Sequence, residues 1–149
     1  MSLWTRGVVV LLLLVHAGCS SSPELPPISE DQADACADLV AALPDRVDGE
    51  ELSDDTDRSA SWGGIELTCG TEMPASYDEF ASCTEVGGVG WFLPPSDLLA
   101  PDSDILVTAL THSPRVSVLI PAVHRGTDVV LTELSPVVRD TLAERAPCL

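Results

Sequence analysis

The segment that decides the fold is Ser61–Gly70, SWGGIELTCG, where the spacing of the apolar residues changes to a period of two. Ile65, Leu67 and Cys69 alternate with polar residues. Successive side chains of a β-strand point to opposite faces of a sheet, so this alternation predicts a half-buried strand. We therefore expect Cys69 to face the core together with Ile65 and Leu67.

An amphipathic helix is predicted upstream of this strand. Ser29 and Gln32 have the spacing of a capping box, in which each side chain satisfies a backbone N–H at the start of a helix. Apolar residues then recur at helical spacing, at Cys36, Leu39, Val40 and Leu43. Pro44 ends the pattern, because proline cannot continue a helix. The helix should carry Cys36 on its buried face.

Residues 45–57, DRVDGEELSDDTD, are acidic and polar and predict a loop, with a short strand at 46–52 as an alternative. A calcium site is the competing interpretation. The segment lacks the alternating ligands, the central glycine and the closing glutamate of an EF-hand loop. A solvated acidic loop is therefore the favoured interpretation.

The later segments predict more strands and a closing helix. Residues 82–86 and 89–93 flank Gly87-Gly88, which is a hairpin signal. Strands are also expected at 104–111 and 115–123, joined by residues 112–114, and a short one at 129–132. Ser135 as N-cap and Pro136 at the first position predict a C-terminal helix. Residues 29–149 should form one α+β domain: an N-terminal helix, about five mostly antiparallel strands in one sheet and a C-terminal helix, in two layers.

Five cysteines indicate a protein braced by disulfides. An exported protein with an odd number of cysteines has one left over, and Cys19 is the natural candidate. The other four are Cys36, Cys69, Cys83 and Cys148. Counting alone leaves three pairings open. The positions on predicted elements favour Cys36–Cys69, from helix to sheet, and Cys83–Cys148, from sheet to C-terminus.

The first residues predict an export signal. Arg6 precedes a run of eight Val and Leu residues, 8–15, which is too short to span a bilayer. His16-Ala17-Gly18-Cys19 resembles a bacterial lipobox, with His16 where the pattern usually has Leu. We therefore expect residues 1–18 to be removed and Cys19 to carry lipid. Residues 20–27, SSSPELPP, would then be an extended tether, so residues 19–28 connect the lipid to the domain.

The charge of the chain excludes one class of partner. It has 24 acidic residues and 7 basic ones, all arginine, for a net charge of −17. Loss of Arg6 with the signal makes this −18. Such a domain repels nucleic acid, so nucleic-acid binding is not expected.

No catalytic or metal-binding motif is apparent in the sequence, and no cofactor is predicted. The histidines of the mature chain, His112 and His124, bracket one predicted strand and are interpreted as turn residues. The glycines at 87, 88 and 90 precede strand residues, as in a turn, rather than a helix, as in a phosphate loop. Trp62, at a strand entrance, is either a core residue or part of a recognition surface.

Three segments carry a resemblance to a known family: CADLVAALPDRVDGEE at 36–51, SWGGIELTCG at 61–70 and EVGGVGWF at 85–92. With the lipobox, they resemble small actinobacterial lipoproteins that are classified only as a domain of unknown function. The resemblance covers residues 36 to about 143. It implies an address in the cell envelope, supports the pair Cys36–Cys69, and implies no activity, cofactor or catalytic residue.

The favoured hypothesis is a non-enzymatic binding or accessory module, held on the outer face of the cell membrane by lipid on Cys19. Its partner would be an envelope protein or a cell-wall component. One alternative is a binding protein for a small cationic ligand or a metal, which requires converging carboxylates. The other is a cell-wall hydrolase, which requires two carboxylates about 5–10 Å apart in one cleft.

Overall fold

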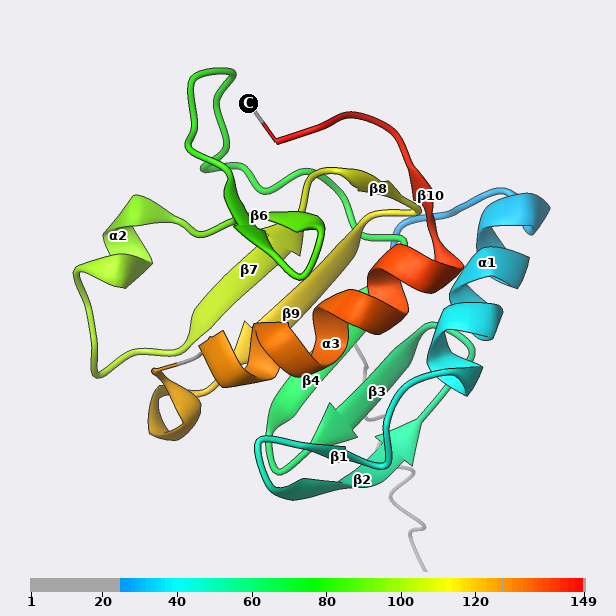
Figure 1. Ribbon diagram of the computed structural model, residues 1–149, viewed down its shortest axis with the longest axis horizontal. Helices are drawn as coiled ribbons and strands as arrows, with labels where there is room; N and C mark the ends of the chain where they lie inside the picture. The colour runs from blue at the N-terminus through cyan, green and yellow to red at the C-terminus, as the bar shows by residue number, and fades with distance from the viewer. Residues whose placement is uncertain (1–24, 127, 149) are drawn as a thin grey trace, which may run out of the picture.

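An antiparallel sheet of eight strands forms the centre of the molecule (Figure 1). The structure is a computed structural model, and it describes residues 25–126 and 128–148. The signal segment and Cys19 lie outside the described residues. The helices are α1 (Glu30–Ala41), α2 (Pro95–Leu98) and α3 (Asp128–Thr141), with a 3₁₀ turn η1 (Ala122–His124). The strands are β1 (Arg46–Val47), β2 (Glu50–Asp55), β3 (Ser59–Trp62), β4 (Ile65–Cys69), β5 (Thr84–Val86), β6 (Val89–Phe92), β7 (Ile105–Ala109), β8 (His112–Ser113), β9 (Val116–Ile120) and β10 (Ala143–Glu144).

The strands run in the order β1-β2-β3-β4-β9-β7-β6-β5, and β8 pairs with β10 in a separate ribbon. β4 and β9 are the two central strands, with Leu67 opposite Val118. Figure 1 shows α3 crossing in front of the sheet and α1 beside it. The α+β class, the antiparallel sheet and the two disulfides were predicted correctly. The number of strands and the placement of the helices were not.

One face of the sheet and the inner faces of α1 and α3 share a core. β4 contributes Ile65, Leu67 and Cys69, as its alternation predicted, and all three are fully buried. α3 contributes the stripe Val130, Leu131, Leu134 and Val138. Burying this much apolar surface is the main force that holds the helices on the sheet.

The capping box at the start of α1 is present: Ser29 Oγ accepts the Gln32 N–H, and Gln32 Oε1 accepts the Ser29 N–H. Cys36 faces the core and forms a disulfide with Cys69 at the end of β4. Cys83 forms a disulfide with Cys148. These are the pairs that the sequence favoured.

The C-terminal helix begins earlier than predicted. Residues 129–132 belong to α3 and not to a strand, and Ser135 and Pro136 lie inside the helix rather than at its start. Proline inside a helix removes one backbone hydrogen bond. The apolar residues Val130, Leu134 and Val138 recur every four positions, so the helix buries a continuous stripe that outweighs this loss.

The acidic segment 45–57 is mostly a hairpin, β1–β2, and not a loop. Asp48 and Gly49 form its turn with positive φ angles of 49° and 82°. Asp-Gly is a preferred pair for a two-residue hairpin turn, because both central residues must adopt positive φ. The number of strands therefore exceeds the predicted five partly because this turn signal was overlooked.

Trp62 is fully buried, and its Nε1–H donates to the carbonyl of Pro44. It joins β3 to the segment after α1. The interpretation of Trp62 as part of a recognition surface is therefore wrong. His112, predicted to lie in a turn, is a buried residue of β8.

We predict that Ser135→Ala destabilises the fold through Trp91. The Trp91 Nε1–H donates to Ser135 Oγ at 3.0 Å, and both side chains are fully buried. Removing the acceptor leaves a buried donor without a partner, which costs about 1–3 kcal/mol of unfolding free energy. Urea unfolding measures this cost, with exposed Ser76→Ala as the matched control. Equal stability of the two variants would contradict the prediction.

Candidate functional site

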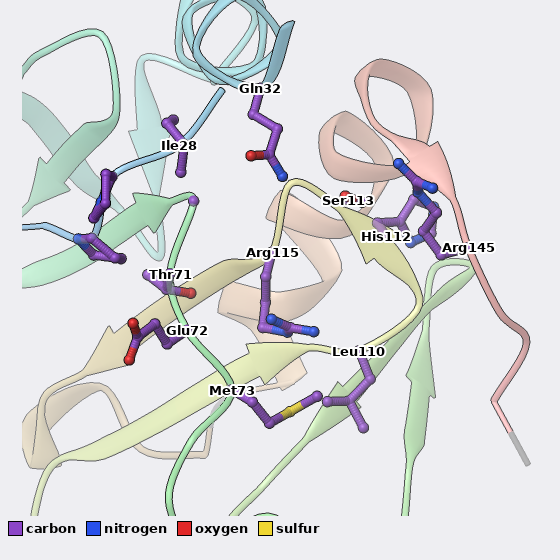
Figure 2. Close-up of a pocket in the computed structure, with 13 residues that line it drawn as sticks. Ile28, Gln32, Thr71, Glu72, Met73, Leu110, His112, Ser113, Arg115 and Arg145 are labelled. Carbon is purple, nitrogen blue, oxygen red and sulfur yellow. The ribbon is translucent and has the colours of Figure 1, made fainter. Parts of the chain in front are cut away.

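An open pocket of about 570 Å³ lies beside the end of β4 and the start of β9. Its wall is made from segments that are far apart in the sequence, as Figure 2 shows. They are residues 26–28, Gln32 of α1, residues 70–73, residues between 110 and 115, and Arg145. The pocket therefore exists only when residues 26–28, the sheet and the C-terminal segment are assembled.

Arg58 fixes one wall of the pocket. Its guanidinium donates to three backbone carbonyls, those of Pro26, Cys69 and Gly70, at 3.1, 3.2 and 2.9 Å. The first of these bonds fastens the segment before α1 to the end of β4. Gly70 allows this close approach, because a Cβ there would lie 2.7 Å from Arg58 Nη2 and 3.0 Å from Ile28. Its φ of +74° also favours glycine.

Arg115 stands at the centre of the pocket wall, one residue before β9 (Figure 2). Its carbonyl accepts the N–H groups of Gly70 and Thr71, which fixes its backbone to the opposite wall. Its Nε atom is buried without a hydrogen-bond partner. Among the described residues, its guanidinium forms no ion pair.

Arg145 reaches the same pocket from the C-terminal segment. β10 pairs with β8, and the Arg145 N–H donates to the carbonyl of Thr111. Its guanidinium also has no ion pair in the described part of the chain. The other four arginines there direct their guanidinium groups into hydrogen bonds: Arg46 and Arg139 with carboxylates, Arg58 and Arg125 with carbonyls. Arg115 and Arg145 are the exceptions, and both line one pocket.

Further polar groups of the wall are arranged around Arg115. Gln32 extends from α1 towards the pocket (Figure 2). Its Oε1 is occupied by the capping box, which leaves the amide N–H groups as the part that can bind a ligand. Glu72 is the one carboxylate of the wall, and its side chain points away from the Arg115 guanidinium (Figure 2). The arrangement is rich in hydrogen-bond donors.

His112 lies against the same pocket with 4% of its surface exposed. Burial lowers its pKa, the Glu144 carboxylate acts in the opposite direction, and Arg139 lowers it further. The Nδ1 atom contacts Thr111 Oγ1 at 2.9 Å, and that hydroxyl accepts the Gly90 N–H. His112 is therefore neutral at pH 7, and its charge does not add to that of the arginines.

None of the site residues predicted from the sequence lines this pocket. Cys36–Cys69 and Cys83–Cys148 are structural braces, Trp62 is in the core, and Cys19 lies outside the described residues. Sequence reasoning missed Arg115, Arg145 and Gln32. The signal that was available is scarcity: a lysine-free chain has few cations, so each arginine merits inspection.

Comparisons with known proteins find one family. A family model described as "Protein of unknown function (DUF3515)" matches residues 4–147. No curated protein and no solved structure matches. Within residues 25–126 and 128–148, no helix is long and apolar enough to cross a membrane, and no three His, Cys, Asp or Glu side chains gather as metal ligands do.

We predict that His112 makes folding stability dependent on pH. Its folded pKa is lowered from 6.5, so the unfolded chain binds the proton more readily. The His112 contribution is complete above 6.5 and is lost as the pH falls towards the lowered pKa of the folded state. Unfolding free energies of the wild type and His112→Gln, measured from about pH 8 to about pH 5, should approach each other at low pH. A difference that stays constant across this range would contradict the prediction.

Proposed function

The chain belongs to the DUF3515 family of proteins of unknown function, and from this premise we propose that it is a lipid-anchored, non-enzymatic binding module of the cell envelope. Cys19 carries the lipid, and the domain stands on the outer face of the membrane. We also propose that the actinobacterial proteins that this chain resembles are lipoproteins. The ligand site is the pocket around Arg115.

The observation that carries the binding role is the set of unpaired donors in this pocket. Buried polar groups in proteins are nearly always hydrogen-bonded, so an orphaned group such as Arg115 Nε requires an explanation. Within the described segments, the protein places no acceptor of its own against this guanidinium, and a ligand bound at the exposed edge of the guanidinium is one explanation. The pocket volume of about 570 Å³ is within the range of small-ligand sites.

Anchoring and binding fit together through the tether. Pro26 and Pro27 line the pocket, and seven residue positions separate Cys19 from Pro26. At about 3.3 Å per residue, a lipid on Cys19 would keep the pocket within roughly 25 Å of the membrane surface. The binding site of such a protein would be presented to molecules at that surface.

The two alternatives receive less support from the described residues. A hydrolase needs two carboxylates in one cleft, and this pocket has Glu72 alone. A second concavity, of about 530 Å³, holds Asp45 and Glu51, but Glu51 there pairs with Arg46. A cation site would have to compete with that arginine.

We expect Cys19→Ala to release the protein from the membrane. Without the thiol no diacylglycerol can be attached, and the two acyl chains are lost as an anchor. Cell fractionation measures the fraction of each variant that is retained in the membrane. The intact mass of the mature wild type shows whether Cys19 is acylated. Cys83→Ala is the matched control, because it removes a cysteine from the domain and leaves Cys19 in place. Membrane retention of Cys19→Ala to the wild-type extent would overturn the anchoring proposal.

We expect a photo-cross-linking amino acid at Met73 to capture a defined ligand in intact cells. Met73 lines the pocket and is 39% exposed. The same amino acid at Val123, which is 86% exposed and outside the pocket, is the control. Mass spectrometry should find an adduct at Met73 that is absent at Val123. Identical or absent adducts at the two positions would contradict binding in this pocket.

A further inference from the structure

We propose that the pocket binds an oxyanion, a carboxylate or phosphate group, at the guanidinium group of Arg115, and that Arg145 adds a second positive charge to the same pocket. The inference rests on the proposed function, since it specifies the ligand of the same site. It concerns the chemistry of recognition and requires no reaction.

The first argument is the charge balance of the chain. Acidic residues outnumber basic ones by 24 to 7, so an exposed arginine has an abundance of carboxylates to pair with. Arg46 and Arg139 do so, with Glu51 and Asp140. Arg115 and Arg145 both lack such a partner in the part of the chain that the structure describes. The fold thus keeps two cations apart from its own anions at one place.

The second argument is the buried donor. Arg115 Nε has no partner although the atom is inaccessible to solvent. Arginine presents five N–H donors in a planar fork that matches the oxygens of a carboxylate or a phosphate. A carboxylate or phosphate would bind at the exposed edge of the Arg115 guanidinium, on the side that faces the pocket. It would form the charge-assisted hydrogen bonds that the protein itself does not supply.

The third argument is the chemistry of the remaining wall. Gln32 can offer amide N–H groups, because its carbonyl oxygen is already engaged by Ser29. Glu72, the one carboxylate of the wall, points away from Arg115 (Figure 2). Two cations and one anion therefore line the pocket, the reverse of the balance in the whole chain. A neutral or cationic ligand would leave the two guanidinium groups uncompensated.

The test uses the processed, lipid-bearing protein in dodecyl maltoside micelles, which contain no charged groups. Inorganic phosphate and acetate are titrated at constant ionic strength, with chloride as the balancing anion. Amide NMR signals of Gly70 and Thr71 report binding, because both N–H groups donate to the Arg115 carbonyl. We expect saturable shifts with phosphate, acetate or both, and none with chloride.

Variants locate the site. Arg115→Gln/Arg145→Gln should weaken oxyanion binding by about tenfold or more, since a hydrogen bond to a charged group is lost at Arg115 and a second positive charge of the pocket is lost at Arg145. Arg46→Gln removes a charge outside the pocket and should bind as the wild type does. Arg115→Lys should recover part of the affinity, which a merely structural role of Arg115 would not explain. Absence of saturable shifts, or equal weakening in Arg46→Gln, would overturn the inference.

A last arm identifies the source of the oxyanion. Phosphatidylglycerol added to the micelles offers the same phosphate chemistry on a lipid. Saturation at a lower concentration than free phosphate requires would assign a lipid headgroup, and equal or weaker saturation would assign a soluble oxyanion. An adduct at Met73 without any oxyanion binding would leave the binding module intact and refute only its proposed ligand class.

Discussion

The three hydrogen bonds of the Arg58 guanidinium are the constraint on which the candidate site depends. They join the carbonyls of Pro26, Cys69 and Gly70, so one side chain holds Pro26 against the end of β4. The Cys36–Cys69 disulfide fastens α1 to the same end of the same strand. The covalent bond fixes the helix and the guanidinium fixes the chain that enters it. Together they give the pocket a wall that neither the sheet nor the helix could form alone.

The chain has no lysine, so arginine is its only permanently charged cation, and two of the uses of arginine bear on the candidate site. Arg58 and Arg125 each satisfy several carbonyls of irregular backbone, a task for which the planar guanidinium is suited. Arg115 and Arg145 instead keep their donors free at the pocket. In the structural use the guanidinium donates hydrogen bonds to carbonyls that burial has removed from water. In the other use the free guanidinium groups make the pocket locally positive in an acidic protein. The same residue type therefore serves both the fold and the candidate site.

Patterns that are local in sequence could be predicted, and those that depend on distant partners could not. The capping box of Ser29 and Gln32 and the alternation in β4 are decided within a few residues, and both were predicted correctly. Pro136 was misplaced because the packing of α3 on the sheet overrides a local rule about proline. The turn at Asp48 and Gly49 was a local signal that the acidity of its surroundings concealed.

The candidate site was beyond prediction for a physical reason. Its residues have no fixed spacing, since Gln32 and Arg145 are separated by most of the domain, and Arg145 is brought to the pocket by the pairing of β10 with β8. A motif can be recognised in a sequence when one loop supplies all its groups, as a phosphate loop does. Here the groups come from separate segments, so the site forms only when the tertiary structure brings these segments together. The sequence does show the shortage of cations. In an acidic chain, the position of an arginine without a carboxylate partner therefore indicates where a ligand could bind.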